Sequence, residues 1–397
     1  MPPLMPFEEA LKSLQESSKT LVQAENCELG NALNRILCED VLAQCYVPPC
    51  DNSAMDGYAL RYEDWQADKA LSVSQYIAAG SAPDPLQAGS CARIFTGANI
   101  PAGADVVIMQ ENAQVTEQGV IFAQQPKRHD NIRPRGQDMS IGQTVLRAGT
   151  KIKAMHIGLL SSLGLTKVSV YQPLKVGILT TGDELVPTGH TLEAGQIYNS
   201  NGPMLQALVS QLGYQVTCAL HVKDEEQATL DALTKLSQEC DVILSSGGVS
   251  VGEKDYVTQC LEQLGQLHLW KIAIKPGKPL VHASVNGVPF LGLPGNPSST
   301  LVTFHWFART LLAASAGQQT ARPKAYPVTA GFSRNKSIGR DEFIRVSMDE
   351  KGSAIAHRQQ SSGALLAACE SLGYLHIKAG ERIEEGKEYD FYPFSEF

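Results

Sequence analysis

The chain has 397 residues, so at roughly 150 residues per domain we expect two to four domains rather than one small fold. Hydrophobic residues make up 43% and charged residues 19%, which is typical of folded globular proteins and excludes a disordered chain. The 33 Lys and Arg against 41 Asp and Glu give a formal net charge of −8, which argues against a nonspecific binder of nucleic acid or anionic membranes. Any anion site must therefore be local.

The cysteines and the N-terminal segment indicate a reduced, cytoplasmic protein. The nine Cys are odd in number and form no C-x-x-C pair, which argues against a disulfide framework or a zinc site. The chain does not start with a basic segment followed by an apolar run, so we predict no secretory signal. The richest apolar segment, 301–314, carries His305 and Arg309 and is too short to span a bilayer.

The spacing of apolar residues and the positions of Gly and Pro predict an α/β multidomain protein. Helical spacing predicts a helical lead-in over 7–44, and short β-like runs between Gly and Pro predict a β-rich insertion. Runs at 176–179, 241–244 and 288–293 each precede a Gly-rich turn and a helical stretch, as in a parallel sheet covered by helices. The predicted parts are a helical and mixed N-terminal domain (1–45 and 146–173), an inserted β-rich domain (46–145), a central parallel-sheet α/β domain (174–321) and a small C-terminal β domain (322–397).

The first candidate binding loop follows the strand at 241–244. Its glycines, Gly247, Gly248 and Gly252, would let a phosphate approach backbone amides at a helix start. The loop matches neither the Walker nor the dinucleotide pattern, and a tight strand-to-helix turn explains the glycines as well. Asp255 favours the phosphate interpretation, because a carboxylate beside a phosphate suits a bridging Mg²⁺.

Acidic loops follow two further strands of the predicted sheet. Asp183 and Glu184 end the strand at 176–179, and Asp224 and Glu225 follow a strand that ends near residue 222. Such carboxylates suit hard-cation binding or catalysis, although helix N-capping is the commoner explanation for an isolated Asp and the favoured one for Glu225. Acidic loops gathered at one sheet edge would repel one another unless cations lie between them.

A basic turn and a proline-rich turn complete the central domain. Pro276, Gly277 and Pro279 stiffen the turn that presents Lys275 and Lys278, which favours an oxyanion site over a solvated basic turn. In the segment 291–300, a proline-initiated helix with Ser caps explains the local pattern but not the basic turn before it. In the β-rich insertion, the segment 51–59 is by composition an Asx-rich turn with Gly.

Seven ordered segments resemble one family. Taken together, they resemble the MoeA-type molybdopterin molybdenumtransferases, which are related to the E domain of gephyrin, and the likeness covers almost the whole chain. The segments are 51–59, 95–98, 109–111, 181–185, 246–252, 274–279 and 293–297.

The resemblance implies a four-part elongated protomer with a molybdopterin-binding-like α/β domain, acting as a homodimer. It also implies that molybdate is inserted into adenylylated molybdopterin with release of AMP, and that Mg²⁺ is the cofactor. The molybdopterin adenylyltransferase is a possible partner protein. Asp56 and Thr96 would act in the partner's cleft, and lysines, Arg345 and hydroxyls would surround molybdate. The implied catalytic residues are Asp56, Thr96, Glu184, Lys271, Lys275, Lys278 and Arg345; the substrate-binding residues are Gly247, Gly248, Ser250, Gly252, Pro294, Pro297, Ser299 and Ser362, with Ser361 the alternative to Ser362; the metal ligands are Asp224 and Asp255.

Two residues depart from the pattern of the family. Asn199 stands where members usually carry Asp, and Gln137 replaces a common Glu. The chemistry nonetheless fits the residues, because rigid lysines with an Arg and hydroxyls suit a tetrahedral dianion, and no Cys is expected to be catalytic. Two alternatives remain open from sequence: an adenylyltransferase of the preceding step, and a scaffold with a vestigial site.

Overall fold

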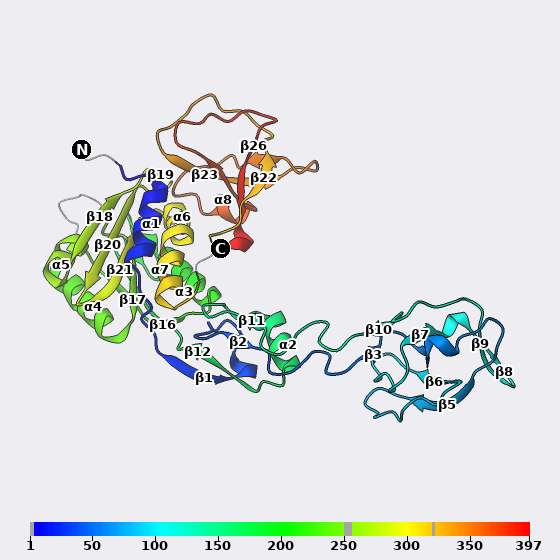
Figure 1. The fold of residues 1–397 in the computed structure, drawn as a ribbon. Coiled ribbons are helices and arrows are strands. Elements are labelled where there is room, and N and C mark those ends of the chain that lie inside the picture. The colour runs from blue at the N-terminus through cyan, green and yellow to red at the C-terminus, as the bar shows by residue number, and fades with distance from the viewer. Residues whose placement is uncertain (1–3, 250–255, 320–321) are drawn as a thin grey trace.

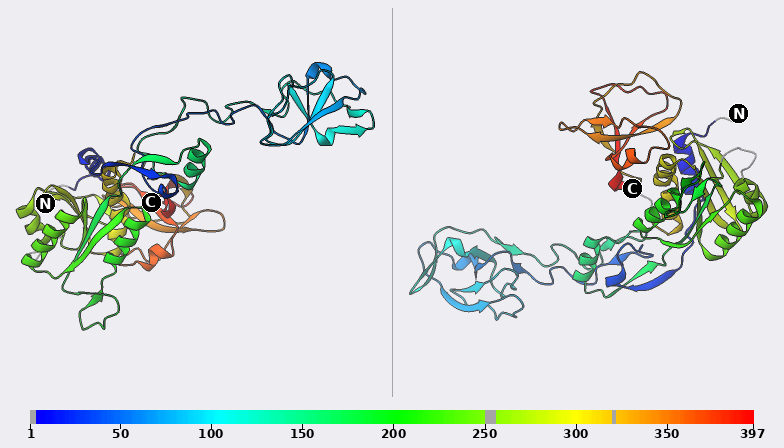
Figure 2. Two further views of the ribbon diagram at one scale, coloured as in Figure 1. Left: turned by 90° about the horizontal axis from the view of Figure 1, so that it is seen from below. Right: turned by 180° about the vertical axis from the view of Figure 1, so that it is seen from behind.

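The computed structural model describes residues 4–249, 256–319 and 322–397. Figure 1 shows that both termini lie in one part of the molecule, and that a β-rich module stands apart from it at the end of a narrow two-chain neck. The two further views in Figure 2 show the same separation. The α/β multidomain fold predicted from sequence is confirmed.

A six-stranded sheet in the order β16-β13-β17-β21-β20-β18 forms the centre of the α/β domain. The first four strands pair in parallel, as predicted, whereas β20 pairs with β21 and β18 with β20 in antiparallel fashion. The sheet is therefore mixed, because Asn286 and Gly287, both at positive φ, join β20 to β21 by a tight hairpin instead of a helical crossover. The strands are β13 (Lys175–Thr181), β16 (Gln215–Val222), β17 (Val242–Ser246), β18 (Leu267–Lys271), β20 (Pro279–Val285) and β21 (Val288–Leu293).

Helices cover both faces of this sheet, and each face has its own apolar core. Alternate side chains of a strand point to opposite faces, so Val242 and Leu244 of β17 enter one core and Ile243 enters the other. The helices are α3 (Asn201–Gln211), α4 (Glu226–Glu239), α5 (Tyr256–Leu264), α6 (Pro297–Thr303) and α7 (Arg309–Ser315), with the π-helical segment η4 (Phe304–Ala308) between the last two.

The predicted helical lead-in over 7–44 is correct only for α1 (Phe7–Ser17). Phe7 and Leu14 of this helix pack into the core beside Phe307 of the α/β domain. The second apolar group has helix-like spacing, but Asn34 has φ 65° and Leu37 bridges Val170, so the chain turns instead of continuing a helix. The other elements here are β1 (Ala24–Glu28), η1 (Leu29–Asn31), β2 (Val41–Leu42), β11 (Thr144–Leu146), α2 (Ala154–Ser162) and β12 (Lys167–Tyr171), with β1 paired to β12.

The module beyond the neck is built on a four-stranded sheet in the order β5-β6-β4-β7. Its buried side chains form two cores of its own, one on each face of that sheet. The elements are β3 (Asn52–Ser53), β4 (Gly57–Leu60), η2 (Tyr62–Asp64), β5 (Ser72–Ile77), β6 (Ser90–Ile94), β7 (Val106–Met109), η3 (Gln110–Asn112), β8 (Ala113–Thr116), β9 (Gly119–Phe122) and β10 (Ile132–Arg133).

The C-terminal β sheet has the order β19-β23-β25-β26-β22 and includes a strand from the α/β domain. This strand, β19 (Ile274–Lys275), pairs in parallel with β23, which sets Lys275 opposite Glu342. The two domains therefore share one hydrogen-bonded sheet. The remaining elements are β22 (Tyr326–Thr329), β23 (Asp341–Met348), β24 (Ala354–Ala356), α8 (Leu366–Cys369), β25 (Gly373–Ile377), β26 (Glu388–Pro393) and η5 (Phe394–Glu396); a small ribbon of β14 (Leu185–Val186) and β15 (Ile197–Tyr198) lies in the α/β domain.

All nine cysteines lie in the described residues, and each is a free thiol. Among the described residues, no helix has both the length and the apolar character needed to cross a membrane.

Candidate active site

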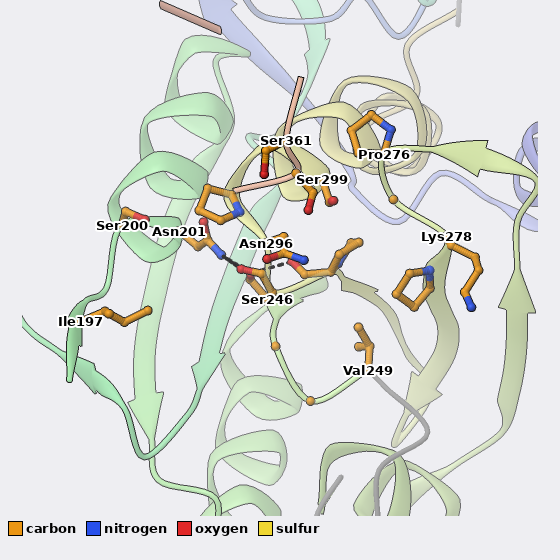
Figure 3. Close-up of a pocket in the computed structure, with 18 of the residues that line it drawn as sticks. Ile197, Ser200, Asn201, Ser246, Val249, Pro276, Lys278, Asn296, Ser299 and Ser361 are labelled. Atoms are coloured by element: carbon orange, nitrogen blue, oxygen red, sulfur yellow. Dashed lines mark hydrogen bonds between the residues drawn. The ribbon is translucent and has the colours of Figure 1, made fainter. Parts of the chain in front are cut away.

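A cavity of about 850 Å³ lies at the carboxyl ends of β13, β17 and β21, where parallel α/β sheets bind ligands. The basic turn between β19 and β20, the N-terminus of α6 and the 360–362 loop of the C-terminal domain enclose it. Figure 3 shows Lys278 on one flank, Ile197 and Ser200 on the opposite flank, and Ser246 and Val249 between them. The sequence-predicted residues that line it are Glu184, Gly247, Gly248, Lys275, Lys278, Pro294, Pro297, Ser299 and Ser362, together with the alternative Ser361.

The two glycines after β17 allow the chain to turn tightly along the cavity. Gly247 has φ 96° and Gly248 has φ 65°. A Cβ at Gly248 would lie 2.3 Å from Cγ2 of Val257, and one at Gly247 would lie 2.8 Å from the carbonyl oxygen of Thr181. Only glycine fits at these positions, so backbone instead of side chains lines this part of the cavity.

The basic turn presents its two lysines in different ways. Lys275 Nζ donates a hydrogen bond to Oε1 of Glu342 at 2.8 Å, and Arg334 pairs with the other oxygen of the same carboxylate. Lys278 is exposed at the cavity, and no hydrogen bond or ion pair of its side chain is found among the described residues. Lys278 is therefore the cation with the greater capacity to bind an anion, whereas Lys275 is partly neutralised.

The N-terminus of α6 is held in place by buried polar contacts. Asn201 Nδ2 donates to Ser246 Oγ at 2.8 Å and to the carbonyl oxygen of Gly295 at 2.7 Å. The amide of Ser298 donates to the carbonyl oxygen of Ser362 at 2.8 Å, which fixes the C-terminal loop against the helix. Ser299 of α6 and Ser361 of the loop both face the cavity (Figure 3).

Arg345 lies behind the cavity and not in its lining. It is only 2% exposed, and its guanidinium donates to the carbonyl oxygens of Ala364 and Ser361, each at 3.0 Å, and to the hydroxyl of Ser298. The Arg345 side chain therefore joins the 361–364 loop to α6. In this way it positions the hydroxyls of Ser361 and Ser362, which lie in that loop.

Acidic side chains gather beside the glycine turn. Glu184 lines the cavity, and the amide of Asp224 donates to Oδ1 of Asp183 at 3.2 Å. Burial raises the pKa of Asp224, and the nearby charges of Asp183 and Glu184 add to that rise. Within the described residues, no group of three or more His, Cys, Asp or Glu side chains could hold a metal ion. The carboxylates suit Mg²⁺ in chemistry, but these residues alone do not complete a site.

Several predicted residues lie elsewhere. Asp224 is next to the cavity without lining it, and Lys271, at the end of β18, is outside the lining. Asp56 and Thr96 lie in the distant β-rich module, where the Asp56 carboxylate accepts hydrogen bonds from the amide and hydroxyl of Thr96 at 2.7 and 2.8 Å (Figures 1 and 2). The predicted Ser250, Gly252 and Asp255 lie outside the described residues.

Sequence reasoning missed the lining residues Asn201, Arg340 and Gln360, and it gave no site role to Thr181 and Asn296, although both lie in segments that carry the resemblance. Arg340 lies five residues before the predicted Arg345, and Gln360 directly precedes Ser361, so only proximity in sequence could have indicated them. Asn199, one of the two departures, also lines the cavity. It accepts from the amide of Gly202 and donates to Thr180 Oγ1, both at 2.9 Å, whereas an ionised Asp could only accept from the Thr180 hydroxyl.

Three family models match consecutive parts of the chain: the MoeA N-terminal region (domain I and II) at residues 5–164, a probable molybdopterin binding domain at 177–314 and the MoeA C-terminal region (domain IV) at 318–394. A molybdopterin molybdenumtransferase of Haemophilus influenzae is 40% identical over 348 residues, covering 86% of this chain and 85% of the relative. The chain belongs to the MoeA family of molybdopterin molybdenumtransferases.

Other members agree in sequence and in structure. A molybdopterin molybdenumtransferase of Nostoc sp. is 40% identical over 298 residues, covering 72% of this chain and 68% of the relative. The crystal structure of a molybdopterin biosynthesis moeA protein from Pyrococcus horikoshii OT3 is 30% identical with a TM-score of 0.84, covering 99% of this chain and 100% of that one. This MoeA family member is therefore an enzyme of molybdenum cofactor biosynthesis.

Proposed function

We propose that this chain transfers molybdenum from molybdate to the dithiolene of adenylylated molybdopterin and releases AMP in a Mg²⁺-dependent reaction. The observation that supports the proposal is the cavity itself, which combines Lys278, unpaired within the described residues, and two serine-bearing segments with a glycine turn and an acidic edge. The lysine and the serine hydroxyls suit a tetrahedral dianion such as molybdate, and the glycine turn with the acidic edge suits a phosphoanhydride.

In the proposed reaction, two Mo–S bonds form and one Mo–O bond breaks. The released oxygen leaves as water with the two thiol protons, so no oxidant or reductant is needed. A second step consumes one water and converts the phosphoanhydride to a phosphate monoester and AMP.

The residues of the cavity bind and orient the two substrates. Lys278, with the hydroxyls of Ser299 and of Ser361 or Ser362, would hold the molybdate oxygens, while Lys275 adds charge that Glu342 partly offsets. The glycine turn would let the phosphates approach backbone amides. Mg²⁺, with Asp224 and Asp255 as its proposed ligands, would neutralise charge on the anhydride.

We further propose that the active site is shared between two protomers of a homodimer. Asp56 is partly exposed, and backbone and side-chain hydrogen bonds from Thr96 lower the pKa of its carboxylate, which favours the ionised form. Within one chain the β-rich module, whose strand β4 follows Asp56 directly, stands apart from the α/β domain (Figure 2), so a role in the cavity requires a partner's module. We also propose that the protein is cytoplasmic and that it contacts the molybdopterin adenylyltransferase. Co-sedimentation of the two proteins tests this contact.

The decisive assay measures AMP release from adenylylated molybdopterin with and without molybdate. Lys278→Ala should raise the KM for molybdate about tenfold or more, since it removes one charged hydrogen-bond donor, and should leave the affinity for the pterin nearly unchanged. Lys351→Ala, which removes an exposed lysine outside the cavity, is the matched control. Molybdate-independent consumption of ATP would instead favour the adenylyltransferase alternative, and absence of any turnover would favour a scaffold.

Mixed dimers test the shared site. At molybdate concentrations well below the raised KM of Lys278→Ala, dimers of Asp56→Ala and Lys278→Ala subunits should be more active than either variant alone, because one of the two sites would then be intact. Activity no higher than that of the separate variants would place each complete site within one chain.

A further inference from the structure

A second cavity, of about 420 Å³, lies where the N-terminal helix, the α/β domain and the end of the chain meet. Its walls come from α1, residues 151–153, the 212–214 turn, η4, α7 and residues 395–397. Figure 1 shows α1, α7 and the C-terminal end close together. The cavity shares no lining residue with the active-site cavity, so it is a separate feature.

The lining of this cavity carries an excess of positive charge. Its cationic side chains are Lys151, Lys153, Arg309 and Arg322, and among the described residues of the lining Glu396 is the only acidic one. The Arg322 guanidinium pairs with Glu8. Three cations therefore share one carboxylate across a recessed space.

The innermost cations have little compensation from the protein. Lys151 Nζ donates to the carbonyl oxygen of Leu212 at 2.8 Å, and Arg309 lies over the ring of Phe397 at 5.8 Å. For the Arg309 guanidinium, the described residues provide no hydrogen bond and no ion pair. Burial lowers the pKa of Lys151, and the charges of Arg309 and Lys153 lower it further. Lys151 and Arg309 are half-buried, and together with Lys153 they face one carboxylate, Glu396, among the described residues of the lining, so the cavity presents more positive than negative charge to an anion.

We propose that this cavity binds a small phosphate monoester, with Arg309 and Lys151 at the phosphate group and Lys153 at the rim. The guanidinium and ammonium groups supply the donors that phosphate oxygens accept. The volume lies within the range of pockets that hold small organic ligands and exceeds what a bare inorganic ion needs. The aromatic side chains of Tyr214 and Phe397 give the cavity an apolar wall for the organic part.

The enclosed position favours a small ligand over an acidic segment of another protein. The charges of Lys151 and Arg309 are recessed between three parts of the chain, whereas a protein partner would engage charges on an exposed face. If an acidic side chain of a second copy of this chain fills the cavity instead, the proposal is overturned.

The test is isothermal titration calorimetry of the full-length protein with inorganic phosphate and with AMP, combined with crystals grown with AMP. Because AMP is also a proposed product of the active site, the crystals decide which of the two cavities AMP occupies. We expect binding of both probes, with AMP density at Arg309. Arg309→Met should weaken this binding about tenfold or more, because it removes a charged donor pair.

Two further variants keep the proposal falsifiable. Lys153→Met, at the exposed rim, should weaken phosphate binding about threefold. Because it leaves the packed interior intact, this variant tests the proposal even if Arg309→Met does not fold. Lys12→Met removes an exposed lysine of α1 that is outside the cavity lining and should change nothing. Equal phosphate affinity in wild type, Arg309→Met and Lys153→Met would overturn the proposal, as would a crystal in which a partner's acidic side chain fills the cavity. Failure of the molybdate assay would leave this outcome unaffected.

Discussion

Glu342 is the residue at which stability and the active site are most directly connected. Its side chain is 5% exposed, and its carboxylate bridges Lys275, which is 41% exposed, and Arg334, which is 30% exposed. Breaking a fully buried ion pair costs about 3 to 5 kcal/mol, and an exposed pair contributes about 0 to 1 kcal/mol. Because the acid is buried and the bases are partly solvated, we expect Glu342→Gln to lower the free energy of unfolding by about 2 kcal/mol.

The pH dependence of that loss identifies its cause. Burial raises the pKa of Glu342, but hydrogen bonds from Arg334 and Lys275 outweigh it and lower the pKa below its usual value of 4.5. A carboxylate with a lowered pKa contributes stability above the pKa of the unfolded chain and loses it as the pH falls through the folded pKa. The difference between wild type and Glu342→Gln should therefore be constant near neutral pH and shrink below 4.5.

Urea denaturation at several pH values measures this difference. Glu381→Gln, which breaks the more exposed pair with Lys387 in the same domain, is the matched control and should cost no more than about 1 kcal/mol. Lys275→Met should make the Glu342→Gln change less costly, because one of the two cations is then already absent. The reasoning would be refuted by equal losses in the two glutamine variants, or by a loss at Glu342 that persists at low pH.

Three further perturbations probe the surroundings of the two cavities. Gly248→Ala should destabilise the fold by about 1 to 3 kcal/mol, measured by denaturation, because φ is 65° and the new Cβ would collide with Val257. Arg345→Lys should accelerate hydrogen exchange in residues 361–364, since lysine cannot bind both carbonyl oxygens that the guanidinium holds; unchanged exchange would contradict the positioning role. Burial, aided by the charge of Arg309, lowers the pKa of His305 to about 3, so wild type should lose stability relative to His305→Gln as the pH falls from 6.5 toward that value; parallel pH profiles would disprove this.

The sequence was most informative where function and local backbone geometry coincide. Gly247 directly follows β17 and Pro297 begins the helix after β21, and the carboxyl ends of parallel strands meet at one sheet edge. The convergence of these two residues on one cavity therefore follows from the predicted parallel strands, whereas Lys278 reaches the same edge because β20, which it precedes, runs antiparallel to β21.

Features that depend on contacts between distant segments could not be predicted. Nothing near Glu342 in the sequence indicates that it meets Lys275, because their register results from the pairing of β19 with β23. Arg345 matched a ligand-binding position, yet its burial depends on carbonyl groups of the 361–364 loop. The spacing of Ile36 and Leu37 suggested a helix, and tertiary pairing with Lys151 and Val170 prevailed over it.

The two-residue strand β19 explains why the cationic wall of the active site depends on the C-terminal domain. Because Lys275 is hydrogen-bonded into the sheet of that domain and ion-paired to its Glu342, the basic turn is anchored from both sides. Arg345, on the same strand β23, anchors the serine loop, which forms another wall of the cavity. Both walls thus depend on one strand, so a shift of β23 would move lysines and hydroxyls together. An anion that binds between the walls must in turn stabilise the docking of that domain, because it binds only the arrangement in which both are present.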